Sequence, residues 1–264
     1  MLGIGTWGMG ESKQSRQREI DAVRLAVDSG LRLIDTAEMY ADGGAEEVVG
    51  KAVEGRRGDV FIVSKVLPHH ASRKGTIAAC EASLRRMNTD YIDLYLLHWR
   101  GGVPLAETVE ALAKLQHDGK IRHWGVSNFD TEDMEELFEL PGGEHAQTNQ
   151  VLYNLSRRGI EFDLLPWCVQ RRMPVMAYSP LEQGRILGNT TLRRIAEDRA
   201  CSPAQIALAW VMRSGDVIAI PKAATPDHVH QICGTLDIVL SPEELQALDR
   251  VFAPPKRKVP LEMI

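Results

Sequence analysis

The chain has 264 residues, of which 44% are hydrophobic and 25% charged, and its formal net charge at pH 7 is -5. This composition is typical of a globular protein and gives no sign of a polyanionic partner, since the only basic cluster is PPKRK near the C-terminus. No apolar run is long enough to span a membrane, and the N-terminus does not resemble a signal peptide. Four scattered cysteines without C-x-x-C spacing favour reduced thiols. We therefore expect a cytoplasmic monomer that binds a small molecule and no nucleic acid, membrane or metal.

Short β-rich runs alternate with longer amphipathic segments along the whole chain. Several of these runs are apolar almost throughout, which is typical of strands buried on both faces. Eight strands alternating with helices, without a linker, predict a single-domain (β/α)8 TIM barrel over residues 1–264 rather than an open doubly wound sheet. The predicted strands span residues 2–7, 31–37, 60–66, 91–98, 121–128, 146–153, 174–180 and 216–222.

Helices are predicted from periodicity and from capping signals. Apolar residues at helical spacing predict helices over 19–29 and 105–117. Ser202 and Ser241 each precede a proline and are followed three positions later by Gln or Glu. Both patterns predict a helix N-terminus with a capping box.

The stretch from Gly3 to Gly8 matches the pattern G-x-G-x-x-G. A dinucleotide fingerprint needs a strand before the glycines and a helix that begins within them. Only two residues precede Gly3, and a polar segment follows the pattern. We interpret the stretch as the first strand, with glycines where the backbone turns into the barrel mouth.

Polar and aromatic residues follow the predicted strands at their C-terminal ends, which is where the active sites of such barrels lie. Taken singly, each has a structural interpretation; a lone histidine, for instance, is more often part of the core. Their coincidence on one rim predicts a site. The rim residues, in strand order, are Asp35, Tyr40, Lys65, His98, Ser127, Asn128, Gln150, Tyr178, Ser179 and Lys222.

Four of these residues suggest proton donation. The pKa of a free tyrosine is about 10, too high for ready proton release at neutral pH. An ammonium about 4 Å away stabilises a phenolate by about 4 kcal/mol at an effective dielectric of about 20, so we expect Lys65 to lower the pKa of Tyr40 toward neutrality. Asp35 would keep Lys65 charged. With His98 donating a hydrogen bond to a substrate oxygen, the set suits carbonyl reduction, for which a cofactor must supply the hydride.

The sequence resembles the aldo-keto reductases, as a bacterial-type member with short loops. The resemblance covers nearly the whole chain and implies a (β/α)8 barrel that uses NADPH, less often NADH. It rests on motifs that occur in order on the predicted strands, namely LGIGTW, DTAEMY, VSK, YIDLYLLHW, GVSNF, NQVLYN, AYSPL and IPKA.

The resemblance also implies roles for individual residues. Tyr40 would be the general acid, Asp35 and Lys65 its partners, and His98 the residue that orients the carbonyl. Tyr178 would stack on the nicotinamide. The implied coenzyme contacts are Thr6, Trp7, Ser127, Asn128, Gln150, Tyr178, Ser179, Pro180, Leu181, Gln183, Gly184, Ile220, Lys222, Ala223, Ala224 and His228.

Within that set, the resemblance implies that Ser127, Asn128 and Gln150 hold the nicotinamide amide. The segment 179–184 would run under the pyrophosphate, and Lys222 would meet the adenosine 2′-phosphate.

The chain departs from the family pattern in three places. Ala223 and His228 stand where the family often has Ser and Arg, which weakens the predicted 2′-phosphate site, although Lys222 still favours NADPH. The β-hairpin that usually plugs the barrel floor is missing, because the chain starts at the first strand. The loop after His98 and the C-terminal tail are short, so we expect an open pocket, lined by Trp7 and Trp99, and broad selectivity.

The predicted function is NAD(P)H-dependent reduction of aldehydes and ketones, with hydride transfer from nicotinamide C4 and Tyr40 protonating the alkoxide. Two alternatives remain open at this point. One is a Schiff-base aldolase that uses Lys65 as the nucleophile. The other is a non-catalytic, cofactor-sensing regulatory subunit of a membrane channel, because a fold by itself does not fix a function.

Overall fold

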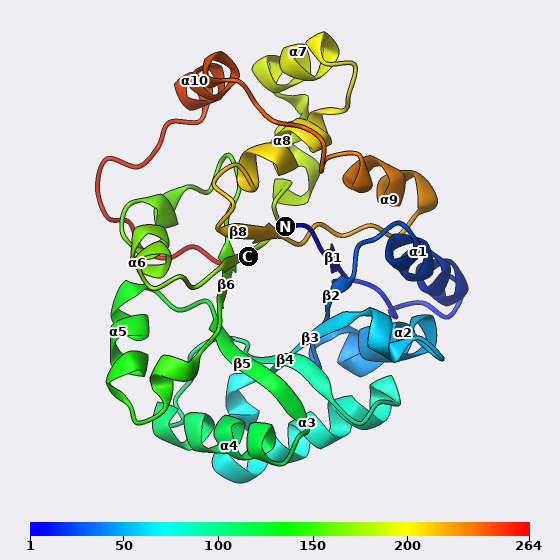
Figure 1. The fold of residues 1–264 in the computed structure, drawn as a ribbon, viewed down its shortest axis with the longest axis vertical. Coiled ribbons are helices and arrows are strands. Elements are labelled where there is room, and N and C mark those ends of the chain that lie inside the picture. The colour runs from blue at the N-terminus through cyan, green and yellow to red at the C-terminus, as the bar shows by residue number, and fades with distance from the viewer.

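The computed structural model describes all 264 residues, and its eight strands form an inner ring surrounded by helices (Figure 1). The strands follow one another around the sheet in chain order, and every neighbouring pair is parallel. This confirms the predicted (β/α)8 barrel. The strands are β1 (Ile4–Gly5), β2 (Leu33–Asp35), β3 (Phe61–Val66), β4 (Ile92–Leu97), β5 (Ile121–Ser127), β6 (Asn149–Leu152), β7 (Val175–Tyr178) and β8 (Val217–Ala219).

The barrel closes where β8 returns to β1, and glycines make that closure possible. The backbone N–H of Gly3 donates to the Ala219 carbonyl oxygen at 2.9 Å. A Cβ atom at Gly3 would lie 2.5 Å from Cδ2 of Leu33, and one at Gly5 would lie 3.0 Å from the Ile220 carbonyl oxygen. The interpretation of this stretch as a strand is confirmed. These two glycines, however, allow close approach to β2 and β8 rather than a turn into the mouth.

Helices cover the outside of the ring, and their boundaries follow the capping signals. Ser202 and Ser241 cap α8 and α10 with complete capping boxes. The helix predicted over 105–117 is α4, and the one over 19–29 begins three residues earlier as α1. The helices are α1 (Arg16–Asp28), α2 (Gly44–Ala52), α3 (Arg73–Met87), α4 (Leu105–His117), α5 (Thr131–Glu139), α6 (Leu164–Gln170), α7 (Thr190–Asp198), α8 (Pro203–Val211), α9 (Pro226–Cys233) and α10 (Pro242–Val251).

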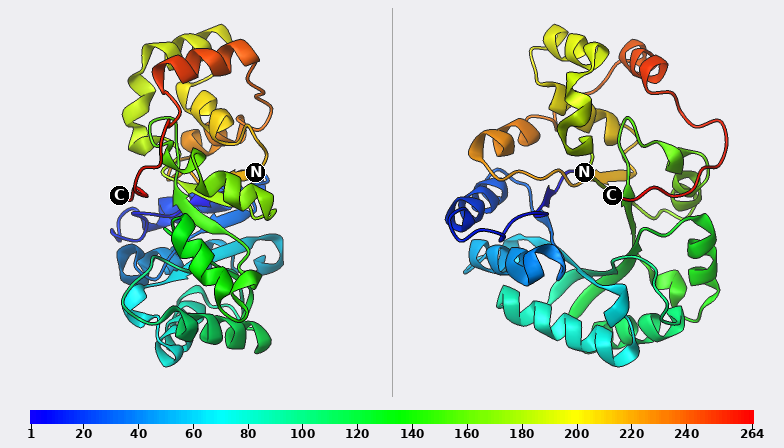
Figure 2. Two further views of the ribbon diagram at one scale, coloured as in Figure 1. Left: turned by 90° about the vertical axis from the view of Figure 1, so that its left-hand side faces the viewer. Right: turned by 180° about the vertical axis from the view of Figure 1, so that it is seen from behind.

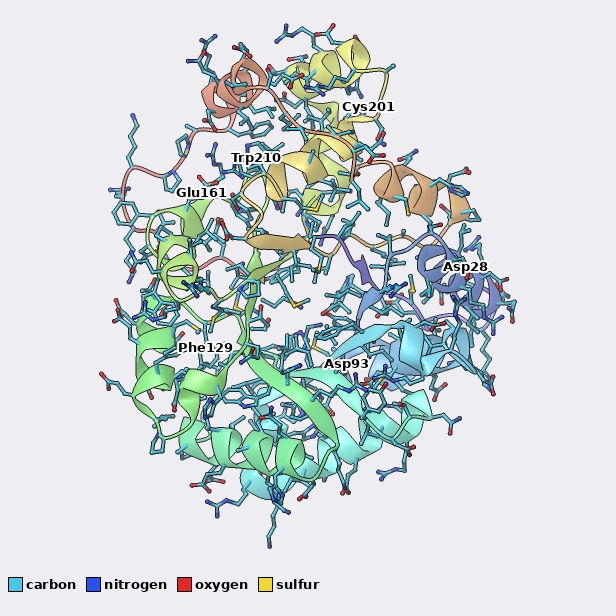
Figure 3. The ribbon with its side chains drawn as sticks, viewed as in Figure 1. Asp28, Asp93, Phe129, Glu161, Cys201 and Trp210 are labelled. Carbon is cyan, nitrogen blue, oxygen red and sulfur yellow. The ribbon has the colours of Figure 1, made fainter.

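Side chains fill the layer between the strands and the helices (Figure 3). Phe129 and Trp210 have no exposed surface there. All four cysteines are free, and burial raises the pKa of the Cys80 and Cys168 thiols to about 12, so both are unreactive packing groups. None of the helices combines the length and the apolar character needed to cross a membrane.

The two termini lie on opposite faces of the barrel (Figure 2). Met1 is at the floor, where the strands begin, and its amine donates to the Val217 carbonyl oxygen at the start of β8. A cavity of about 700 Å³ opens at this floor, among its lining residues Leu33, Phe61, Leu94 and Met176. This cavity is thus at the end of the barrel away from the predicted rim. The C-terminal tail returns to the opposite face.

Candidate active site

The four residues predicted to form the proton-donating set come together at the barrel mouth, around the Lys65 amine. Lys65 Nζ donates to Asp35 Oδ2 at 2.8 Å, to the Thr36 carbonyl oxygen at 2.8 Å and to the Tyr40 hydroxyl at 3.2 Å. The rings of Tyr40 and His98 meet edge to face, with centroids 5.8 Å apart. Lys65 has no exposed surface and Asp35 almost none. The amine is therefore saturated by three acceptors inside the protein.

A tight turn after β2 aims Tyr40 at this amine. The backbone N–H of Tyr40 donates to the Ala37 carbonyl oxygen at 3.1 Å, and a 3-10 turn begins at Tyr40 itself. Ala41 and Asp42 adopt left-handed conformations with φ of 51°, which folds the chain back over the mouth. The Trp7 ring meets the Tyr40 ring edge-on at 5.1 Å. The phenol is thus held from two sides.

Lys65 stays an ammonium in this setting. Burial by itself would lower the pKa of Lys65, but the Asp35 carboxylate and the Tyr40 hydroxyl outweigh it, and the net pKa is raised. The prediction that Asp35 keeps Lys65 charged is confirmed. A Schiff-base nucleophile must be a neutral amine, so this environment argues against the aldolase alternative.

Asp35 has a second partner that the sequence did not indicate. Gln150 Nε2, from β6 across the barrel, donates to Asp35 Oδ1 at 2.7 Å. Both carboxylate oxygens are therefore occupied, one by Lys65 and one by Gln150. Only the side-chain oxygen of Gln150 remains to accept a hydrogen bond from a ligand.

The expectation that Lys65 brings the pKa of Tyr40 down toward neutrality is wrong for this structure. Burial raises the pKa of Tyr40, Lys65 lowers it, Asp35 raises it again, and the net direction is upward. The ammonium alone does not set this pKa. The phenol is only 8% exposed, so desolvation raises its pKa, and the Asp35 carboxylate partly cancels the ammonium.

His98 is a neutral imidazole beside the phenol. Burial and then the Lys65 charge lower the pKa of His98 to about 2. Its Nδ1 is buried without a protein partner, and the Trp99 ring lies 4.9 Å from the imidazole between centroids. His98 can exchange a hydrogen bond with a substrate oxygen, but it does not carry a positive charge at neutral pH. The Trp7 ring lies against Tyr40 and the Trp99 ring against His98, and their role as pocket walls stays a prediction.

Residues from β5, β6 and β7 form a polar wall next to this set. Ser127 Oγ donates to the Gln150 carbonyl oxygen at 2.8 Å. Asn128, with φ of 58°, donates from Nδ2 to the His98 carbonyl oxygen and accepts from the Tyr178 hydroxyl at 3.0 Å. Burial raises the pKa of Tyr178 to about 12, so its phenol stays neutral. The Tyr178 ring remains partly exposed and is available for stacking.

The segment after β7, which we call the coenzyme loop (residues 179–184) after its predicted role, has an unusual backbone. Ser179, Glu182, Gln183 and Gly184 all have positive φ, between 46° and 86°. Ser179 and Leu181 are partly exposed, and Gln183 and Gly184 are exposed. Left-handed conformations cost energy in non-glycine residues and are maintained only where the surroundings impose them.

A buried carboxylate imposes this loop conformation. Glu182 is 3% exposed and accepts from Asn154 Nδ2 at 2.8 Å. Its other oxygen accepts from Arg157 and from Arg185. Asn154 also donates to the Ser179 carbonyl oxygen at 2.9 Å. The sequence did not predict this network. The only local feature that points to it is the pair Arg157 and Arg158, shortly after NQVLYN.

The residues predicted to meet the 2′-phosphate lie after β8. Lys222 is exposed, and its amine would be 3.0 Å from a Cβ at Gly8, so it lies over the turn that follows β1. His228 is exposed in the first turn of α9, where its backbone N–H donates to Thr225 Oγ1 at 3.3 Å. Ala224 is partly exposed between them.

Besides Ser127 and Gln150, four of the predicted coenzyme contacts are buried. Thr6 and Ala223 have no exposed surface, so neither offers a ligand any contact in this structure. Thr6 Oγ1 donates to the Asp35 carbonyl oxygen at 3.0 Å, and Ala223 packs in the core. Ile220 and Pro180 are buried as well. These four residues form the wall behind the site.

The chain matches the model of the aldo/keto reductase family over residues 1–253. It is 56% identical over 268 residues to methylglyoxal reductase YeaE of Escherichia coli, covering 100% of this chain and 94% of that protein. It is 37% identical over 248 residues to glyoxal reductase of Bacillus subtilis, covering 92% and 87%. An aldo/keto reductase from Klebsiella pneumoniae solved with NADP and acetate superimposes with a TM-score of 0.98 at 56% identity, covering 100% of this chain and 95% of that one. The protein therefore belongs to the aldo/keto reductase family.

Proposed function

We propose that the protein reduces small vicinal dicarbonyls, such as methylglyoxal and glyoxal, with Tyr40 as the general acid. The protein is an NADPH-dependent oxidoreductase of carbonyl groups, as its family and its NADP-bound relatives show. The dicarbonyl substrate class is supported by two relatives described as methylglyoxal and glyoxal reductases. The observation that carries the mechanism is the chain of contacts from Tyr40 through Lys65 to Asp35.

The residues at the mouth suit a dihydronicotinamide coenzyme. No protein group donates a hydrogen bond to Gln150 Oε1, so this oxygen can accept from a carboxamide N–H. Ser127 and Asn128 would hold the same amide, and the partly exposed Tyr178 ring would stack on the nicotinamide. Lys222 would pair with the 2′-phosphate. When bound, NADPH supplies the hydride.

Side chains of the protein donate the proton and stabilise the charge that is left behind. Because its pKa is raised, Tyr40 is fully protonated at neutral pH and ready to donate. An alkoxide is far more basic than a phenolate, so proton transfer from Tyr40 to the forming alcohol is downhill. The phenolate left behind lies 3.2 Å from the Lys65 ammonium, which stabilises it. His98, being neutral, orients the carbonyl by a hydrogen bond without competing as an acid.

The mouth also suits a small substrate. The Trp7 and Trp99 rings stand beside Tyr40 and His98 and would form apolar walls on either side of a reacting carbonyl.

We further propose that residues 1–264 act as one domain, and that the protein is a cytoplasmic monomer. The relatives named above are described as reductases, which favours catalysis over a regulatory-subunit role.

Tyr40→Phe tests the assignment. Loss of a general acid lowers rates by about 10²- to 10⁴-fold, so we expect kcat/KM for methylglyoxal to fall by that much. NADPH binding, measured by quenching of tryptophan fluorescence, should persist, because the ring and its contact with Trp7 remain. Tyr91→Phe, which removes a phenol hydroxyl just before the start of β4, away from the mouth, serves as the matched control and should retain kcat. Undiminished turnover in Tyr40→Phe would refute the role of the phenol.

A further inference from the structure

Arg157 joins two segments of the barrel mouth that lie far apart in the sequence. One is the coenzyme loop, where Arg157 donates to Glu182 Oε1 from Nε at 3.2 Å and from Nη2 at 3.1 Å. The other is the end of the chain, which we call the C-terminal strap (residues 258–264). There Arg157 Nη1 forms an ion pair with Glu262. One guanidinium thus uses three of its N–H groups to hold two segments at once.

The coenzyme-loop end of this contact is buried. Hydrogen bonds from Arg157, Asn154 and Arg185 overcome the effect of burial and lower the pKa of Glu182, so its carboxylate is ionised. Because Glu182 itself has φ of 49°, the position of this carboxylate is tied to the strained backbone of the loop. Arg185 is a weaker partner, since more than half of its side chain is exposed, against about a third for Arg157.

The strap end of the contact leads to the nicotinamide side of the site. In Figure 1 the tail leaves α10, passes outside α6 and returns to the centre of the barrel. Lys258 pairs with Glu132 at 2.8 Å, and Val259 packs directly on Gly159. Beyond Glu262, the Ile264 backbone lies close enough to the Tyr178 phenol to act against the rise of its pKa. The strap therefore ends at the ring that we propose stacks on the nicotinamide.

The neighbouring arginine fixes the root of the same tail. Arg158 turns the other way from Arg157 and donates to Asp249 of α10 at 2.7 Å and to the Phe252 carbonyl oxygen. It also pairs with Glu161 and lies over the Trp210 ring; both of these residues are labelled in Figure 3. Arg158 thus anchors the start of the tail at α10, and Arg157 holds the end of the tail through Glu262.

We propose that Arg157 is a positioning residue that locks the coenzyme loop to the C-terminal strap, so that coenzyme retention depends on the strap. The inference rests on the proposed function, because it takes residues 179–184 as the loop over the pyrophosphate. With Glu262 in place, the Arg157 guanidinium is held so that Nε and Nη2 both donate to Glu182 Oε1. Without Glu262, the guanidinium is freer to turn toward solvent, the loop opens more often, and the coenzyme dissociates faster.

Glu262→Gln tests the lock without touching the coenzyme loop or the proton-donating set. We expect NADPH to dissociate about fivefold faster, as for loss of a favourable partly exposed ion pair, in stopped-flow fluorescence. The matched control is Lys258→Gln, which breaks the strap's ion pairs with Glu132 and Asp163 but does not reach Glu182. It should leave the dissociation rate unchanged. Thermal unfolding of both variants separates loss of stability from loss of the lock.

A double-mutant cycle identifies Arg157 as the connection. In an Arg157→Met background, Glu262→Gln should have no further effect on NADPH dissociation. An unchanged rate in Glu262→Gln alone, or an equal effect with and without Arg157, would overturn the lock while leaving the proposed function intact. Failure of the unaltered protein to bind NADPH would instead refute the proposed function, and the lock with it.

Discussion

Replacing Lys65 with methionine removes the ammonium that lies 3.2 Å from the Tyr40 hydroxyl. At an effective dielectric of about 20, that ammonium stabilises a phenolate by about 5 kcal/mol. The Asp35 carboxylate, one hydrogen bond beyond the amine and at most about 6 Å from the phenol, cancels about 3 kcal/mol of this. Lys65→Met leaves this carboxylate in place, so it removes the full stabilisation of about 5 kcal/mol, which corresponds to a fall of about 10³- to 10⁴-fold in the rate of proton transfer. Removing both charges costs only the difference of about 2 kcal/mol, a fall of about 30-fold.

The pH profile of the reverse reaction reports this interaction most directly. Oxidation of an alcohol by NADP⁺ needs Tyr40 as the phenolate, so its rate rises as pH increases through the pKa of Tyr40. Lys65 lowers that pKa, and its removal should therefore shift the rise to higher pH. The assay is kcat against pH for alcohol oxidation, with NADPH binding checked in parallel.

A second variant keeps the test interpretable if Lys65→Met fails to fold. Lys65→Met alone leaves the Asp35 carboxylate buried and unpaired by a cation, which costs about 3–5 kcal/mol of stability. Asp35→Asn combined with Lys65→Met removes both charges and should fold better, yet still turn over slowly. Recovery of full activity and of the original pH profile in the double variant would refute the electrostatic reasoning.

Three further outcomes are expected. Because burial and Lys65 lower the pKa of His98 to about 2, the rate of carbonyl reduction should show no titration of His98 between about pH 5 and 8. A change of rate centred near pH 6.5 that disappears in His98→Gln would contradict this. His228→Arg should tighten NADPH about fivefold and leave NADH unchanged in fluorescence titrations, since a guanidinium grips phosphate with two hydrogen bonds; equal effects on both coenzymes would place His228 outside the phosphate site. Arg86→Met should lower the free energy of unfolding by about 3–5 kcal/mol in urea, because Glu46 has no exposed surface and pairs with Arg86 at 2.5 Å; a loss below about 1 kcal/mol would show that water reaches Glu46.

The sequence predicted the architecture because several strands are apolar runs buried on both faces, a pattern that is uncommon in loops. It overestimated strand lengths at the mouth: the run over 31–37 contains only three paired residues, Leu33–Asp35, before the chain bends toward Tyr40. The proton-donating set was predictable for a related reason. Asp35, Lys65 and His98 lie at or near the ends of neighbouring parallel strands, which a barrel brings to one rim.

Other parts of the site depend on packing that local patterns do not encode. Gln150 donates to Asp35 across 115 positions of sequence, and nothing in either motif indicates the pairing. The direction of the Tyr40 pKa shift depends on how deeply the fold buries the phenol. The contact of Glu182 with Arg157 requires a left-handed backbone at Glu182, which sequence preferences disfavour outside glycine.

The position of the two termini on opposite faces of the barrel decides how this enzyme can be tethered (Figure 2). A surface, an affinity tag or a fused partner attached ahead of Met1 sits beneath the strands, away from the reacting groups. The same attachment after Ile264 would press against the Tyr178 phenol and obstruct entry of reactants. Biosensors or immobilised reactors built from this protein should therefore be anchored through the amino end.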